Sequence, residues 1–92
     1  MKNTIDNFNY YFIQIVSDVE ELCEKWNETR IQTTANLVSG DIIDFRNERF
    51  NAELITDLKA KEFIVKKRIF LSDSKFEEVG GVFLLYIEPI LN

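Results

Sequence analysis

Histidine is absent from the 92-residue sequence. This side chain is the commonest general base at neutral pH and the commonest metal ligand, so its absence removes much catalytic and metal chemistry. Its absence also excludes Ser–His and Cys–His nucleophile pairs. We therefore expect no enzymatic activity, no catalytic residues and no cofactor.

Cys23 is the single thiol and has two interpretations. It could act as a nucleophile or redox sensor, or it could be a small apolar residue of the core. An activated thiolate needs a helix N-terminus or basic neighbours, whereas Glu21 and Glu24 flank Cys23. We expect a structural role. One cysteine cannot form an internal disulfide, which suits a reducing compartment.

Asp41, Asp44 and Glu48 have the spacing closest to that of a cation site. Oxygen ligands of this kind suit magnesium or calcium. The Asp-x-Asp-x-Asp-Gly run of calcium loops is absent, and Gly80-Gly81 lacks the Lys-Ser/Thr of a phosphate-binding loop. We expect a solvated turn and no metal site.

A second group of acidic residues recurs at helical spacing, with Glu21, Glu24 and Glu28 on one face of the expected helix. Such a face is most often simply solvated. The alternative is a surface that meets a basic partner, with an aromatic anchor beside it. The candidate partner-binding residues are Tyr10, Asp18, Glu21, Glu24 and Glu28.

Basic residues concentrate between Lys59 and Arg68, where five cations accompany one acid, Glu62. Lys66 and Arg68, with Ile64 and Phe70 nearby, could contact nucleic acid from one strand face. Alternatively, the lysines protect a strand edge or pair with the acidic helix. The net charge of -5 makes nucleic acid an unfavoured partner.

A long helix over residues 3–29 is the clearest expectation. Asn3 or Thr4 can cap its start. Apolar residues recur there at spacings of three and four: Ile5, Phe8, Phe12, Ile15, Val16, Val19, Leu22, Cys23 and Trp26. Tyr10 and Ile13 lie outside this stripe.

Strands are expected at residues 31–38, 42–45, 50–56, 63–71 and 81–88. The segment 46–60 has a second interpretation. It forms either a hairpin whose tip is 46–48, which we favour slightly, or a second helix on which Phe50, Leu54 and Leu58 share a face. Pro89 should end the last strand, since proline cannot donate to the ladder.

The expected fold is therefore α+β, as a single domain over residues 1–92. One long N-terminal amphipathic helix packs on a three- to four-stranded antiparallel sheet. Residues 63–71 and 81–88 carry apolar side chains on both faces. A single helix covers one face, so a homodimer is the economical way to cover the other.

The N-terminus lacks the apolar stretch of a secretory signal, and no apolar run reaches the roughly 18 residues of a membrane span. We expect a cytoplasmic protein. The first functional hypothesis is a non-enzymatic, acidic binding module. Immunity proteins against nuclease toxins and phage-encoded inhibitors of host enzymes, which block a basic partner, are of this type. The alternative is a structural or assembly subunit acting as an obligate homodimer. A nucleic-acid binder that uses Lys66–Arg68 is the third hypothesis.

Overall fold

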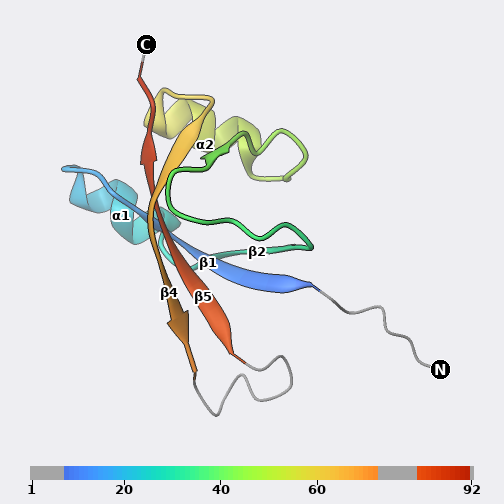
Figure 1. Ribbon diagram of the computed structural model, residues 1–92. Helices are drawn as coiled ribbons and strands as arrows, with labels where there is room; N and C mark the ends of the chain where they lie inside the picture. The colour runs from blue at the N-terminus through green and yellow to red at the C-terminus, as the bar shows by residue number, and fades with distance from the viewer. Residues whose placement is uncertain (1–7, 73–80, 92) are drawn as a thin grey trace.

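The computed structural model describes residues 8–72 and 81–91. The elements, shown in Figure 1, are β1 (Asn9–Ile15), α1 (Glu20–Trp26), β2 (Thr29–Thr33), β3 (Ile42–Ile43), α2 (Asn51–Leu58), β4 (Phe63–Leu71) and β5 (Val82–Pro89). The five strands form one sheet in the order β2-β1-β5-β4-β3. β1 and β5 run parallel, whereas the other neighbouring pairs are antiparallel.

The predicted helix over residues 3–29 is wrong. Residues 9–15 form β1, and only Glu20–Trp26 is helical, while residues 3–7 lie outside the described part. The side chains of β1 alternate, with Tyr11, Ile13 and Ile15 only 0%, 2% and 5% exposed. Val19, from the expected helical stripe, is 45% exposed. The apolar pattern therefore has period two here, as aromatic and β-branched residues favour.

The predicted antiparallel sheet of three or four strands is also wrong. Once residues 9–15 become a strand, they take a central position between β2 and β5. After β1 the chain forms β2, β3 and β4. It then comes back beside β1 as β5, which pairs with β1 in parallel. The sheet is therefore mixed and has five strands.

The favoured hairpin over residues 42–56 is wrong, and the helical alternative is the better description. Residues 51–58 form α2, on which Leu54 and Leu58 are buried one turn apart. The helix ends at Lys59, whose φ of 56° is left-handed. β3 covers only two residues of the expected strand 42–45. β4 coincides with the expected 63–71, and β5 is displaced by one residue from 81–88.

One face of the sheet carries the core, and both helices pack on it. An aromatic series joins its parts: Trp26 of α1 contacts Phe50, Phe50 contacts Phe45, and Phe45 contacts Phe63 of β4, with ring centroids 5.5 to 6.0 Å apart. The buried residues of this core are Tyr11, Ile13, Ile15, Trp26, Ile31, Phe45, Leu54, Leu58, Ala60, Phe63, Val65, Leu85 and Ile87.

Among the residues that the structure describes, those on the opposite face of the sheet contribute no side chain to this core. Side chains alternate along strands, so this face holds the residues between the buried ones. We call it the open sheet face. An irregularity in β4 between Val65 and Lys67 shifts the alternation, so Lys67 lies beside Tyr86 and Ile69 beside Leu84. The open sheet face comprises Tyr10, Phe12, Gln14, Arg30, Gln32, Ile42, Ile64, Lys67, Ile69, Leu71, Val82, Leu84, Tyr86 and Glu88.

Candidate functional site

The carboxylates predicted to bind a partner gather on α1 and the turns beside it. We call this set, with Glu20 added, the α1 acidic surface. Each of its side chains is exposed: Asp18, Glu20, Glu21, Glu24 and Glu28. Among the described residues, none of the five takes part in an ion pair. The structure therefore presents five exposed carboxylates, three on α1 and two on the turns beside it, that no cation of the described residues pairs.

Two hydrogen bonds, one to a side chain and one between backbone groups, fix the position of α1 at the end of β1. The N–H of Ile15 donates to Oδ1 of Asn27 over 2.8 Å. The N–H of Glu28 donates to the carbonyl of Ile13 over 2.7 Å. Glu28 reaches this position with a φ of 67°, a conformation that disfavours residues other than glycine. These contacts hold the α1 acidic surface against the sheet.

Lys25 is the one cation in the segment 18–28. Its ammonium lies 2.6 Å from Glu53 and 2.7 Å from Asp57, both on α2. The hydrogen bonds to Asp57 and then to Glu53 raise the pKa of Lys25 above its usual value. The hydrogen bond that Asp57 accepts from Lys25, followed in size of effect by the one from Trp26, lowers the pKa of Asp57. The cation is therefore engaged by α2 and does not neutralise the outer side of α1.

Tyr10, the predicted aromatic anchor, lies apart from these carboxylates. It is half-buried near the start of β1, whereas α1 follows the other end of that strand. The strand from Tyr10 to Ile15 is roughly 17 Å long at about 3.3 Å per residue. Tyr10 belongs to the open sheet face, so the structure divides the predicted partner-binding residues between two surfaces.

Cys23 is half-buried inside the bend between β1 and α1. Its thiol donates weakly to the carbonyls of Ile15, at 3.4 Å, and Ser17, at 3.5 Å. Neither contact supplies a positive charge to stabilise a thiolate. The structural role expected for Cys23 fits this geometry.

The acidic residues at the expected turn serve separate local contacts. Asp41 accepts the N–H of Val38 at 2.8 Å. Asp44 accepts the N–H and the guanidinium of Arg46, both at 2.9 Å, and the Arg46 side chain is the main cause of its lowered pKa. Within residues 8–72 and 81–91, no three acidic or cysteine side chains are grouped closely enough to hold a metal ion.

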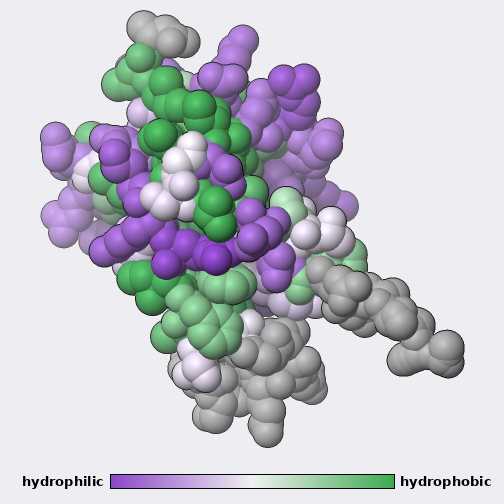
Figure 2. Space-filling model, in the orientation of Figure 1, coloured by the Kyte–Doolittle hydropathy of each residue, from purple (hydrophilic) through white to green (hydrophobic). Residues whose placement is uncertain are grey.

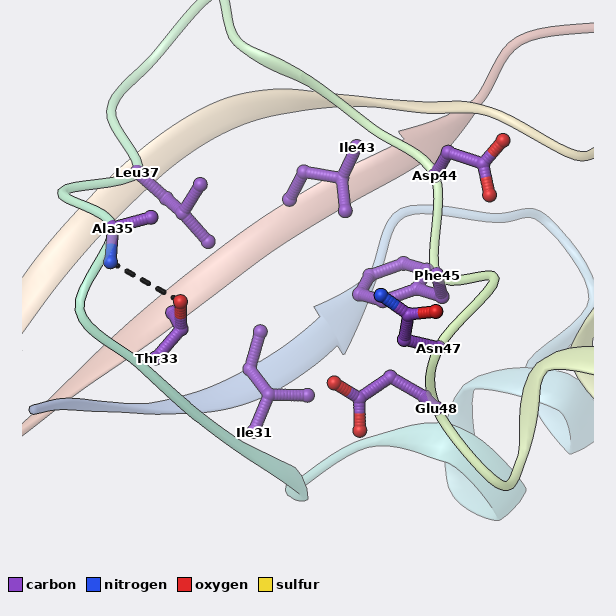
Figure 3. Close-up of a pocket in the computed structure, with 9 residues that line it drawn as sticks. All are labelled: Ile31, Thr33, Ala35, Leu37, Ile43, Asp44, Phe45, Asn47 and Glu48. Carbon is purple, nitrogen blue, oxygen red and sulfur yellow. Dashed lines mark hydrogen bonds between the residues drawn. The ribbon is translucent and has the colours of Figure 1, made fainter.

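A pocket of about 180 Å³ opens between β2 and the segment that follows β3 (Figure 3). Ile31, Leu37, Ile43 and Phe45 contribute apolar lining, and Glu48 is among its polar residues. Thr33 is committed to the turn, because its hydroxyl accepts the N–H of Ala35 at 3.1 Å. Among the described residues that line the pocket, no set of polar groups converges in a way that would define a reaction.

The basic segment is divided between the two faces of the sheet. Lys67 lies with its ammonium 4.7 Å from the ring centroid of Tyr86. Arg68 lies on the core side, 4.5 Å from the ring of Phe83, and donates to Asn36. Lys66 pairs with Glu88 at 3.5 Å. The predicted face that combines Lys66, Arg68, Ile64 and Phe70 therefore does not exist in this sheet.

β4 places its three consecutive cations in the middle of the strand, between apolar ends. On the side of the molecule shown in Figure 2, hydrophilic side chains likewise form a band between two areas of apolar surface.

The open sheet face contains residues that the sequence did not single out as candidates for binding, namely Arg30, Phe12 and Tyr86. The guanidinium carbon of Arg30 lies 5.7 Å from the ring centroid of Phe12. Period-two alternation in residues 9–15 could have revealed this surface. The helical interpretation concealed it, because it assigned Phe12 to the core.

Comparisons with known protein families, with curated proteins and with solved structures find no match for this chain. Neither described helix has the length and apolar character needed to cross a membrane. The functional conclusion therefore depends on the two surfaces themselves.

Proposed function

We propose that the protein is a non-enzymatic binding module whose α1 acidic surface contacts a basic partner protein. An inhibitor or immunity-type protein acting on a nuclease, or on another nucleic-acid-binding enzyme, is the class that fits this description. The observation that carries the proposal is the position of Lys25. Glu53 and Asp57 engage the one cation of the segment, which leaves five exposed carboxylates without an ion-pair partner among the described residues.

The concentration of charge matters more than its total. A patch of one sign attracts an oppositely charged partner before contact and increases the association rate, an effect that salt weakens. A basic active site that binds nucleic acid has the complementary charge. The carboxylates have no ion-pair partner among residues 8–72 and 81–91, so a partner protein could engage them without first breaking a salt bridge within that part of the chain.

The attachment of α1 also supports the proposal. Its C-terminal end is buried through Trp26, which is 5% exposed, and Asn27 ties the following turn to β1. A surface held by a rigid scaffold loses less conformational entropy on binding than a mobile loop does.

An affinity capture from the source cell tests this proposal. The tagged protein is compared with the variant Glu21→Lys/Glu24→Lys at low and at high salt, and the retained proteins are identified by mass spectrometry. We expect a basic protein that wild type retains, that high salt releases and that the double variant fails to retain. Retention of the same proteins by both chains would overturn the proposal.

A matched pair of single variants controls for total charge. Glu24→Lys and Glu62→Lys each change the net charge equally, and both side chains are exposed, but only Glu24 belongs to the α1 acidic surface. We expect Glu24→Lys to reduce capture and Glu62→Lys to leave it unchanged. Equal effects would indicate a response to net charge alone.

The homodimer expected from the sequence stays a prediction. Sedimentation equilibrium over a range of concentrations measures it directly. A dimer mass that persists on dilution would favour the alternative role as an assembly subunit.

A further inference from the structure

The open sheet face has an ordered arrangement of apolar and cationic side chains. The strand register aligns Arg30, Phe12, Leu84 and Ile69 in one row across β2, β1, β5 and β4. The next row contains Gln14, Tyr86 and Lys67. Each row therefore places an aromatic ring near a cation. The guanidinium carbon of Arg30 lies 5.7 Å from the ring centroid of Phe12, and the ammonium of Lys67 lies 4.7 Å from that of Tyr86.

The charge of this face is opposite to that of the whole chain. Arg30 and Lys67 are exposed cations here, and its acid, Glu88, pairs with Lys66. The chain as a whole carries -5, with five acidic residues on the α1 acidic surface. The open sheet face should therefore attract an anionic partner, while the rest of the surface repels one.

A second copy of the chain is a poor occupant for the same reason. Symmetric docking of two open sheet faces would bury Arg30 and Lys67 of both copies in an interface whose acid is already paired. Unpaired charges in a buried interface oppose association. An anion with apolar, planar parts satisfies both features of the face.

We propose that the open sheet face binds single-stranded nucleic acid. The bases stack on the ring of Tyr86, with Tyr10 extending the platform, and Arg30 and Lys67 contact the phosphates. Aromatic side chains on a sheet combined with neighbouring cations are the means by which proteins hold single strands without reading sequence. Duplex is excluded, because its bases are already stacked inside the helix. This inference concerns a different surface from the proposed function and does not depend on it.

Fluorescence anisotropy tests the inference with labelled oligonucleotides of about twelve nucleotides, a length within the site sizes of single-strand binders. Oligo(dT) and oligo(U) distinguish DNA from RNA. A duplex of the same length and a labelled oligoglutamate peptide serve as competitors. We expect single strands to bind, and the logarithm of affinity to fall with the logarithm of salt at a slope of about -1.4 for two phosphate contacts.

Two variants test the roles of ring and charge. Tyr86→Leu keeps apolar bulk but removes the ring, and it should weaken binding about fivefold or more. Lys67→Gln should reduce the magnitude of the salt slope by about 0.7. The matched controls are Phe70→Leu, an aromatic on the opposite face that is 52% exposed, and Lys61→Gln, an exposed lysine outside the strands. Both should bind as wild type does.

Three results would overturn the inference. The first is no anisotropy change with either single strand. The second is equal binding to the duplex, with Tyr86→Leu unaffected. The third is equal or tighter binding to oligoglutamate, which would assign this face to an acidic protein. Thermal unfolding of each variant confirms that a loss of binding is not a loss of fold. None of these results bears on capture through the α1 acidic surface.

Discussion

The indole N–H of Trp26 donates a 2.9 Å hydrogen bond to Oδ2 of Asp57 and thereby joins α1 to α2. The two helices belong to separate parts of the chain, and both pack on the core face of the sheet. Asp57 also accepts the ammonium of Lys25 at 2.7 Å. One carboxylate therefore orients the Trp26 ring of α1 and also holds Lys25, the one cation of the segment 18–28.

Asp57 should make stability depend on pH on the acid side. Hydrogen bonds from Lys25 and then Trp26 lower its pKa in the folded state. A lowered pKa contributes stability that is present above the unfolded value of about 3.9 and is lost as pH falls through the folded value. We expect the stability difference between wild type and Asp57→Asn to be largest near neutral pH and to shrink below about pH 4. Urea unfolding of both proteins at a series of pH values, from neutral to below about pH 4, measures this difference in stability.

The pH effect has an internal control. In a Lys25→Gln background the principal cause of the lowered pKa is absent, so Asp57→Asn should then produce a smaller pH-dependent difference. A difference that stays constant down to the most acidic conditions would contradict this account of Asp57.

Tyr11→Phe should destabilise the protein by about 1 to 3 kcal/mol. Tyr11 is 0% exposed, and its hydroxyl donates to the carbonyl of Ala35 and accepts the N–H of Leu37, each at 2.9 Å. Removing that oxygen leaves two backbone groups without their partner. In Tyr10→Phe the lost hydroxyl has no hydrogen bond to the described residues, so a change under about 0.5 kcal/mol is expected. Equal effects in denaturant unfolding would show that the Tyr11 contacts contribute nothing.

Lys59→Gly should stabilise the protein by about 0.5 to 1 kcal/mol. Lys59 ends α2 in the left-handed conformation, at φ 56° and ψ 38°, which glycine adopts without steric cost. Lys61→Gly, at an exposed position without a positive φ, should be neutral or slightly destabilising. A melting temperature that falls in Lys59→Gly would argue against this helix end.

Val19→Asp and Ile13→Asp distinguish the observed fold from the long helix expected at first. In the long helix Val19 is a core residue and an aspartate there unfolds the protein. In the structure Val19 is 45% exposed and occupies the N-cap of α1 without a side-chain cap. Aspartate is a good N-cap residue, so Val19→Asp should stay folded. Ile13, at 2% exposure, should not tolerate the charge. Circular dichroism of both variants is decisive, and an unfolded Val19→Asp would contradict the structure.

The last two long strands could be predicted from sequence because their signals are local. β4 and β5 consist of apolar runs rich in β-branched and aromatic residues, and Pro89 stands at the end of β5. Such runs suit strands whatever their neighbours are. The prediction for the first third of the chain was wrong because nine of its apolar residues have spacings that fit a helical stripe. Ile13 and Tyr10 did not fit that stripe.

The candidate site was predictable in its composition but not in its geometry. The exposure of Glu21 and Glu24 follows from their charge under either fold. The separation of Tyr10 from them does not, because it depends on whether residues 9–15 are a helix or a strand. The separation of Ile64 from Arg68 and Phe70, which regular alternation would place on one face, depends on an irregularity in β4 between Val65 and Lys67. No residue type in the segment indicates that irregularity.

The association kinetics of the purified captured partner test the central claim most directly. Stopped-flow measurements compare wild type with Glu21→Lys/Glu24→Lys at low and high salt. We predict that the double variant associates about tenfold or more slowly at low salt, while the difference shrinks at high salt and dissociation changes less. Association rates that are equal at low salt and independent of ionic strength would contradict the role of the α1 acidic surface.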